Sequence, residues 1–286
     1  MLGLVGVVVF SMTLPMTRLA VAGLDAGFVA FGRAAVAAVA AAVLLMAWRA
    51  PWPTAAQWRS LVVVAAGIVL GFPYFSSLAM RDVPAAHGAI VVGLLPLATA
   101  VCAAWFARER PSAGFWACAI AGSALVIGFA LRQGGGFAWG DGWMLAAVVA
   151  GAVGYAEGGR LSQTMGGTRT ICWALVVSLP VVLPLAGWRA TVTDWQVPAS
   201  AWGGFAYVAL MSQLIGFFFW YAGLARGGVA RVGQVQLVQP FLTVLFAALV
   251  VGEPLEAATL VFALAVIATV AIGRRAAVRR DVETIR

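Results

Sequence analysis

An apolar segment interrupted by a proline occurs twice in this chain. The first copy is His87–Pro111, and the second, 144 residues later, is Arg231–Leu255. In an alignment without gaps Pro96 falls on Pro240, and each proline precedes a glutamate by thirteen residues. A matched pair of proline-interrupted apolar segments in corresponding halves points to the binding site of a membrane transporter built from internal repeats.

The composition places nearly the whole chain in a lipid bilayer. Hydrophobic residues make up 63% of it and charged residues 10%, whereas soluble domains carry about 25% charged residues. A membrane-spanning helix needs about 20 apolar residues, and the chain contains ten such segments separated by short loops. The sequence therefore predicts an all-α integral membrane protein with ten transmembrane helices, at residues 2–22, 26–48, 61–80, 85–107, 113–131, 143–162, 168–187, 202–224, 230–251 and 256–274.

Several chemistries are excluded by the residue types that the chain lacks. It has no Lys, and its 18 basic residues are all Arg, so a nucleotide-binding P-loop and a lysine Schiff base are ruled out. One His excludes a HExxH zinc site. Cys102, Cys118 and Cys172 lie within apolar runs and suit packing. We expect no cofactor and no metal.

The distribution of arginines predicts the orientation of the chain. Most arginines lie in the loops after the second, fourth, sixth and eighth spans and in the C-terminal tail. Loops rich in arginine face the cytoplasm, so both termini are expected to be cytoplasmic, with the protein in a bacterial inner membrane. A net charge of +8 therefore reports topology and gives no reason to expect nucleic acid. The arginines on the opposite side are at most Arg18, Arg81, Arg132 and Arg189.

The repeat and the span count together predict two inverted halves. Each half holds five spans, and because five is odd the second half must be inverted relative to the first. We assign residues 1–135 to the first half, 136–274 to the second half and 275–286 to a basic cytoplasmic tail. Inverted repeats place the transport pathway at the interface between the halves, near the membrane midplane.

Two short motifs carry a family resemblance. GEPL at Gly252–Leu255 closes the ninth span, and RERP at Arg108–Pro111 occupies the corresponding place in the first half. With ten spans in two halves, the whole chain resembles the EamA-type branch of the drug/metabolite transporter superfamily. Within it the chain looks most like the YddG-type exporters, which move aromatic amino acids and some toxic cations such as methyl viologen out of bacteria. The resemblance implies alternating access around a central cavity lined by spans 1, 3, 4, 6, 8 and 9.

Two prolines are candidates for hinges, and one carboxylate is a candidate for coupling transport to protons. Pro96 and Pro240 remove a backbone donor and are expected to kink their helices, either as hinges or simply as packing features. Glu157 is the carboxylate that lies deepest in a span, where a charge costs about 2.5–3.5 kcal/mol on insertion scales. It is a candidate for proton coupling or for binding an ammonium group; the alternative is a local pair with Arg160, one helical turn away.

Other charged or titratable residues have structural alternatives. His87 either titrates near neutral pH or hydrogen-bonds across helices. Arg33 is expected to extend toward the interface or to pair with an acidic group, without a substrate role. Glu109 and Glu253 lie at helix ends, where we expect them to cap helices and pair with Arg108, Arg110 or the tail.

Polar and aromatic residues within the spans are candidates for substrate binding. Gln236, Pro240 and Thr243 share one helical face by their spacing, and buried amides are costly unless they are satisfied. The face belongs either to the cavity or to a cross-helix contact. Aromatic side chains can stack on flat rings or hold a cation, with lipid or core packing as the alternative. The substrate-binding candidates are Tyr74, Ser77, His87, Thr99, Gln213, Trp220, Tyr221, Gln236 and Thr243.

The sequence thus predicts a secondary transporter that exports small amphipathic metabolites, in particular aromatic and other apolar amino acids. Its expected partners are a small-molecule substrate and the lipid bilayer, with protons if transport is coupled, and it is expected to work as a monomer. The alternatives are a proton-coupled multidrug exporter, an intramembrane lipid-modifying enzyme and a structural scaffold. The single His and the sparse carboxylates disfavour the enzyme. A scaffold would need neither hinges nor buried amides in matched halves.

Overall fold

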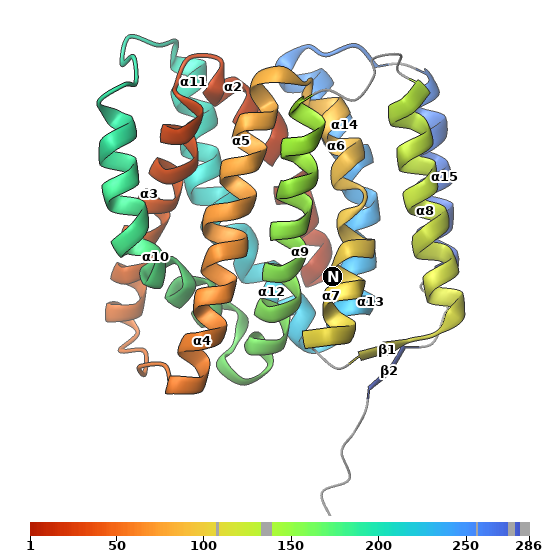
Figure 1. Ribbon diagram of the computed structural model, residues 1–286, viewed down its shortest axis with the longest axis horizontal. Coiled ribbons are helices and arrows are strands. Elements are labelled where there is room, and N and C mark those ends of the chain that lie inside the picture. Colours follow the sequence, from red (N-terminus) through yellow and green to blue (C-terminus); the bar gives the residue numbers. More distant parts are fainter. Residues whose placement is uncertain (107–108, 133–138, 256, 274–277, 281–286) are drawn as a thin grey trace, which may run out of the picture.

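The computed structural model describes residues 1–106, 109–132, 139–255, 257–273 and 278–280. Figure 1 shows a bundle of helices whose axes run up and down side by side. The helices are α1 (Leu2–Ser11), α2 (Thr13–Val21), α3 (Ala26–Ala47), α4 (Ala55–Val64), η1 (Ala65–Gly71), α5 (Phe72–Asp82), α6 (Ala85–Val92), α7 (Leu95–Phe106), α8 (Ala113–Arg132), α9 (Trp139–Met165), α10 (Gly167–Ala190), α11 (Ala199–Ala206), η2 (Tyr207–Ile215), α12 (Gly216–Gly227), α13 (Val229–Gly233), η3 (Gln234–Val238), α14 (Gln239–Val251) and α15 (Ala257–Gly273).

Within these described residues, six helical stretches are long and apolar enough to cross a membrane, which makes the chain a multi-pass membrane protein. The remaining expected spans coincide with α8, α9, α13 to α14, and α15, which are helical but do not meet both criteria of length and hydropathy. The count of ten transmembrane helices therefore stays a prediction. The six stretches are Leu2–Val21, Ala26–Ala47, Ala55–Asp82, Ala85–Ala104, Gly167–Ala190 and Ala199–Gly227.

The bundle is accompanied by one short ribbon that the all-α prediction did not include. Strand β1 (Glu109–Pro111) pairs antiparallel with β2 (Val278–Arg280), with Glu109 opposite Arg280. Both strands have three residues and lie beyond the end of the bundle in Figure 1. The ribbon links the segment after α7 to the C-terminal tail and leaves the helical architecture unchanged.

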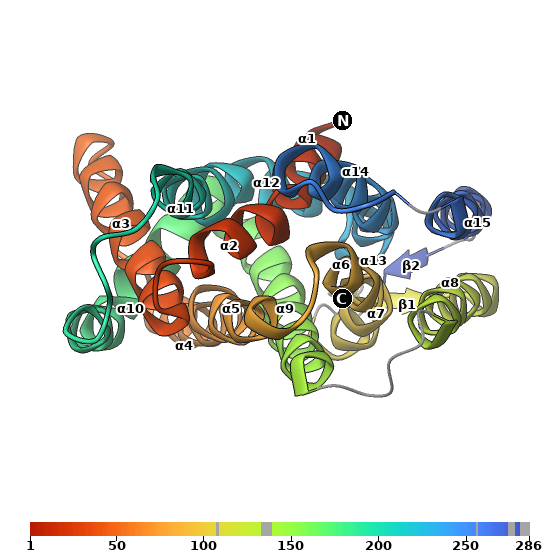
Figure 2. The same ribbon diagram turned by 90° about the horizontal axis from the view of Figure 1, so that it is seen from above.

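The helices pack in pairs that join the first and second halves of the chain. Helix α3 packs along α10, and α8 packs along α15. Figure 2 shows these two pairs at opposite ends of the long axis of the bundle. Between them, α5 packs against α9 while α1 packs against α12. The centre of the bundle is therefore built by helices from both halves.

Each duplicated proline lies just after an interruption within a longer helical stretch. Helix α6 ends at Val92 and α7 begins at Leu95, so Pro96 is the second residue of α7. Likewise η3 is a 3₁₀ helix, and Pro240 is the second residue of α14, which follows it. A proline in a first helical turn removes no hydrogen bond, because the N–H there has no intrahelical acceptor. Each proline therefore follows a local interruption of its helical stretch, and the expected kinks stay a prediction. A hinge at either place stays a prediction.

Two π-helical segments interrupt the long helices on either side of the centre. Segment η1 has seven residues and η2 has nine, and each continues directly into an α-helix. At the end of η1 the N–H of Phe72 donates to the carbonyl of Gly67, five residues earlier. A side chain at Gly67 would come within 2.5 Å of the carbonyl oxygen of Ala150, so this glycine lets η1 lie directly on α9. Widened turns of this kind are frequent at functional sites.

One end of the bundle is tied together by a carboxylate that joins the two halves. Glu253, which follows α14, accepts hydrogen bonds at 2.9 Å from the backbone N–H groups of Ala85 and Ala86 at the start of α6. It also lies 3.5 Å from Nε of Arg18, whose Nη1 donates to the carbonyl of Val83. The capping was expected from the sequence, and the structure shows Arg18 as an arginine partner that was not expected. Of the expected partners, Arg108 and most of the tail lie outside the described residues. A negative charge is favourable at a helix N-terminus.

A second tie at this end joins the loop before α3 to the end of α10. Oδ1 of Asp25 accepts hydrogen bonds from the backbone N–H of Phe28 and from Nε of Arg189, at 2.9 and 2.7 Å. Burial acts to raise the pKa of Asp25, but these hydrogen bonds and the charge of Arg189 outweigh it and hold the pKa below its usual 3.8. The ionised form of Asp25 therefore stabilises the fold at neutral pH.

We predict that Asp25→Asn lowers the melting temperature in detergent at pH 7 by about 2–4 °C, which corresponds to about 1 kcal/mol for a partly exposed ion pair. Because Asn can still cap the helix, the decrease in melting temperature measures the loss of the ion pair with Arg189. A carboxylate with a lowered folded-state pKa contributes stability above about pH 4, and this contribution is lost as the pH falls through the folded pKa. The difference from wild type should therefore shrink as the pH falls below about 4. A difference that does not change with pH would contradict the assignment.

Candidate functional site

A small enclosed cavity of about 20 Å³ lies where both halves of the chain meet. Its walls come from α1, α2, α3, η1, α5 and α6 on one side and from α9, η2, α12 and α14 on the other. It therefore occupies the interface at which the repeat predicts a pathway. The lining residues are Phe10, Thr13, Leu14, Arg33, Ile68, Phe72, Val92, Tyr155, Ser212, Gln213, Phe217 and Gln239.

The charged group of this cavity is Arg33 on α3. Its side chain is among the fully buried ones, with 2% of the residue exposed. Nη2 donates a 3.0 Å hydrogen bond to Oγ of Ser212, which in turn lies 2.8 Å from Oγ1 of Thr13. The other two nitrogens, Nε and Nη1, have no hydrogen-bond partner among the described residues.

This position contradicts both roles that the sequence suggested for Arg33. The side chain neither extends to the interface nor pairs with a carboxylate in the described part of the protein. The signal that could have shown this is the alanine spacing of α3. Ala30, Ala34, Ala37 and Ala41 are all buried and recur every three or four residues, so the residue beside Ala34 also faces the bundle interior. Because α3 is apolar on every side, hydropathy alone did not reveal its buried face.

Glutamine side chains supply further polar groups around the cavity. Nε2 of Gln213 donates to the carbonyl of Ile68 at 3.2 Å, a group in the π-helical segment η1. Gln239 lines the cavity, and its Oε1 is buried without a partner in the described region. Gln236 is also buried, and its amide lies near the hydroxyl of Tyr155, although neither amide atom makes a hydrogen bond of standard geometry to a described residue. Sequence reasoning selected Gln213 and Gln236 but did not select Gln239.

Aromatic rings also line the cavity or pack next to it. The ring centroids of Phe10 and Phe217 are 4.8 Å apart, and those of Tyr155 and Trp220 are 5.4 Å apart. Tyr221 extends the cluster at 5.2 Å from Phe217 and donates from its hydroxyl to the carbonyl of Gly154. Trp220 and Tyr221 were selected from the sequence, whereas Phe10 and Tyr155 were not. Phe10 and Tyr155 could have been selected from their positions in the first and sixth spans, because the family resemblance places both spans at the cavity.

Other candidates are buried near helix contacts without lining this cavity. Thr99, Ser77 and Thr243 are at most 1% exposed. The hydroxyls of Thr99 and Ser77 have no partner among the residues described. Tyr74 is half-buried and stacks on Phe31 with a centroid distance of 5.3 Å. These four residues are not brought together with Arg33 in the present conformation.

The two candidates for proton transfer both have charged partners away from the cavity. Nε2 of His87 lies 2.6 Å from Oδ1 of Asp141, near the starts of α6 and α9. Glu157 accepts from Nε of Arg160 at 2.9 Å, and Arg160 also donates to Oγ of Ser60. This geometry favours the local-pair interpretation of Glu157. In the described chain, no three His, Cys, Asp or Glu side chains converge as a metal site would require.

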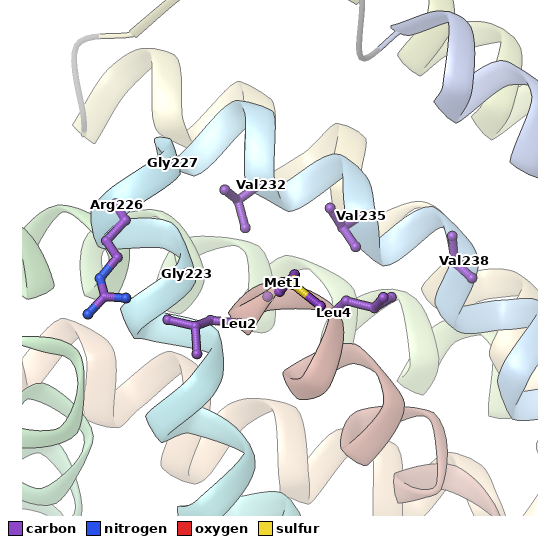
Figure 3. A pocket seen from close by; sticks show the side chains of 10 residues that line it. Met1, Leu2, Leu4, Gly223, Arg226, Gly227, Val232, Val235 and Val238 are labelled. Carbon is purple, nitrogen blue, oxygen red and sulfur yellow. The ribbon is translucent and has the colours of Figure 1, made fainter.

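A second and larger hollow, of about 730 Å³, lies beside the first turn of α1. Figure 3 shows Val232, Val235 and Val238 projecting toward this turn, with Arg226 at one side. Arg226 is the charged residue of a wall that is otherwise apolar or glycine. A recognition site combines an apolar wall with a few converging polar groups, and this combination is found around Arg33 instead.

Comparisons with known proteins agree with this architecture. A model described as the EamA-like transporter family matches residues 1–131 and 138–273. The "Uncharacterized transporter YdeK" of Bacillus subtilis (strain 168) is 48% identical over 277 residues, which cover 96% of each chain. A "Probable terminal-alkyne amino-acid exporter" of Streptantibioticus cattleyicolor is 27% identical over 282 residues, which cover 96% of this chain and 93% of that one.

A solved structure has the same fold. It is described only as "Crystal structure of protein", and it superposes with a TM-score of 0.73 over 95% of this chain and 96% of its own, at 19% identity. The resemblance read from the sequence motifs is thereby confirmed at the level of the family. Because the family model covers both halves and a 48% identical relative covers nearly the full length, the chain belongs to the EamA-like transporter family.

Proposed function

We propose that this transporter exports small amphipathic metabolites, in particular aromatic and other apolar amino acids, by alternating access. The observation that carries the proposal is the small cavity between the halves, which is lined both by the polar side chains of Arg33 and Gln239 and by aromatic rings. An amino acid has a polar end and, in this class, an apolar side chain. The polar residues of the cavity suit the first, and its aromatic rings suit the second. The Streptantibioticus relative, which is named as an amino-acid exporter, supports the same substrate class.

The proposed machinery is ten transmembrane helices in two inverted five-helix halves, residues 1–135 and 136–274. Three features support it. First, α5 packs against α9 in the same way as α12 packs against α1. Second, the π-helical segment η1 in the third span corresponds to η2 in the eighth span. Third, the break before Pro96 corresponds to the 3₁₀ helix η3 before Pro240. The family model also matches the chain in two consecutive ranges. Because one chain encloses the cavity, a monomer suffices.

The small size of the cavity supports alternating access. Ligand sites for drug-sized molecules are about 300–1,000 Å³, whereas this cavity is about 20 Å³. An amino acid fits only after the helices move apart. Glu253 holds α14 against α6 and Arg18 at one end of the bundle, so opening at that end breaks these contacts. The breaks before Pro96 and Pro240 are the proposed hinges.

Both termini are proposed to lie in the cytoplasm of a bacterial cell, since most loop arginines lie on that side. Fusions to a periplasm-active phosphatase and to a cytoplasm-active fluorescent protein test the topology. The fluorescent fusion at the C-terminus should be bright, and the phosphatase fusion there should be inactive. A phosphatase inserted after Val192, in the loop after α10, should show the reverse. An active phosphatase at the C-terminus would overturn the inverted topology.

Counterflow in liposomes that contain only the purified protein tests the function. Vesicles are loaded with unlabelled phenylalanine and diluted into labelled phenylalanine, tryptophan or leucine, without ATP and without a pH gradient. Because exchange through an alternating-access carrier needs no energy source, label should accumulate transiently, and protein-free vesicles should show none. Failure to accumulate any of these amino acids, with or without an imposed proton gradient, would contradict the proposal.

Proton coupling is tested at Glu157. Because this carboxylate is paired with Arg160, we expect Glu157→Gln to lower the melting temperature and to leave the pH dependence of transport as it is in wild type. The measurement is initial uptake between pH 5.5 and 8, with Arg160→Gln as the matched variant that breaks the same pair from the other side. Loss of the pH dependence in Glu157→Gln alone would instead make Glu157 the coupling residue.

A further inference from the structure

The buried charge of Arg33 has no counter-charge among the side chains that the structure describes. The guanidinium of arginine keeps its charge in proteins, and 2% exposure leaves Arg33 almost no access to solvent. Its guanidinium donates a hydrogen bond to the hydroxyl of Ser212, which is neutral. A buried charge without a partner is strongly destabilising, and a charged residue inside a membrane protein marks a substrate or ion pathway by default.

The acidic residues that the structure describes in side-chain detail are engaged elsewhere or exposed. Hydrogen bonds join Asp25 to Arg189, Asp141 to His87 and Glu157 to Arg160, and Glu253 caps α6. Asp82 and Asp194 are exposed. Within this part of the chain, no carboxylate is available to neutralise Arg33.

We infer that Arg33 binds the carboxylate of the transported molecule. This inference rests on the proposed function and narrows it: the cavity takes small carboxylates that carry an apolar or aromatic group, and it rejects cations. A positive guanidinium in a site shielded from water repels a cation strongly. The toxic cations that the YddG-type resemblance suggested are therefore outside the expected substrate range.

The hydrogen-bonding geometry of the guanidinium suits a carboxylate. A carboxylate binds arginine best through two parallel N–H donors. Nη2 has two hydrogens, and Ser212 accepts one of them. Whichever hydrogen is used, the other lies beside the hydrogen of Nε or of Nη1, and neither of these nitrogens has a partner in the described part of the chain. Arg33 therefore retains a complete pair of donors while Ser212 and Thr13 hold its position.

The rest of the cavity fits the remainder of an α-amino acid. Oε1 of Gln239 is an acceptor without a described partner and lines the same cavity, so it is placed to accept a hydrogen bond from an ammonium group. Phe10, Tyr155 and Phe217 line the cavity as the apolar wall. The carboxylate is the group that the site requires, because it alone neutralises the buried charge.

The test uses the counterflow assay with pairs of substrates that differ in the carboxylate. Labelled phenylalanine is compared with phenylalaninamide and with methyl viologen in wild type, Arg33→Met, Arg33→Lys and Arg59→Met. Arg59 is exposed on α4 and controls for the loss of one arginine. We expect wild type and Arg59→Met to transport phenylalanine and neither cation. Arg33→Met should lose phenylalanine transport about tenfold or more, as for the loss of a charged hydrogen bond, and Arg33→Lys should retain part of it.

A melting curve separates binding from a structural role. Removing an uncompensated buried charge should raise the melting temperature of Arg33→Met above that of wild type, and phenylalanine should stabilise wild type but not this variant. A structural arginine would give a lower melting temperature instead.

The possible failures are distinguishable. Absence of counterflow for every substrate in wild type would contradict the proposed function itself. Phenylalanine transport that is equal in wild type and Arg33→Met, or wild-type transport of phenylalaninamide at the rate of phenylalanine, would overturn the role of Arg33 while leaving the transporter intact. Wild-type transport of methyl viologen in place of phenylalanine would overturn both.

Discussion

The structure depends on one constraint, which is that the hydrocarbon core of a membrane offers no hydrogen-bond partner to the backbone. Spanning segments must therefore be helical, and irregular backbone is tolerated only where the protein covers it. The interruptions of this bundle obey the rule: η1 lies directly on α9, and a carbonyl of η1 is satisfied by Gln213 from the other half. The α6–α7 break and η3 lie in contacting helices. Backbone irregularity and polar side chains are thus concentrated between the halves.

The polar cluster at this interface is incompletely satisfied, and its unsatisfied groups indicate what the site binds. In a core that served only stability, Arg33, Gln236 and Gln239 would be costly, since buried polar groups in folded proteins are nearly always hydrogen-bonded. Here two nitrogens of Arg33 and amide atoms of both glutamines lack partners in the described part of the chain. Ser212 and Thr13 position the guanidinium without neutralising it. Stability lost in this cluster is consistent with a site whose last partner is the substrate.

The contacts at one end of the bundle are of a different kind. Glu253 with Arg18, and Asp25 with Arg189, join segments at one end of the bundle through charged groups that remain partly exposed. Partly exposed ion pairs are worth about 1 kcal/mol or less, so they hold a conformation without locking it. A carrier of the proposed kind needs contacts of this strength at its ends.

The sequence by itself determined the membrane class, the family and the position of the two interruptions. Long apolar runs, the duplicated Pro96 and Pro240 and the GEPL motif are local patterns, and local patterns are readable without coordinates. It also identified Gln213, Trp220 and Tyr221 as interior. Only the tertiary structure decided that Arg33 faces the cavity, that Glu253 meets Arg18, and that Tyr74 and His87 do not line the cavity. The physical reason is that a helix apolar on every side has no hydropathy difference between its lipid face and its protein face, so only packing selects which side chains meet.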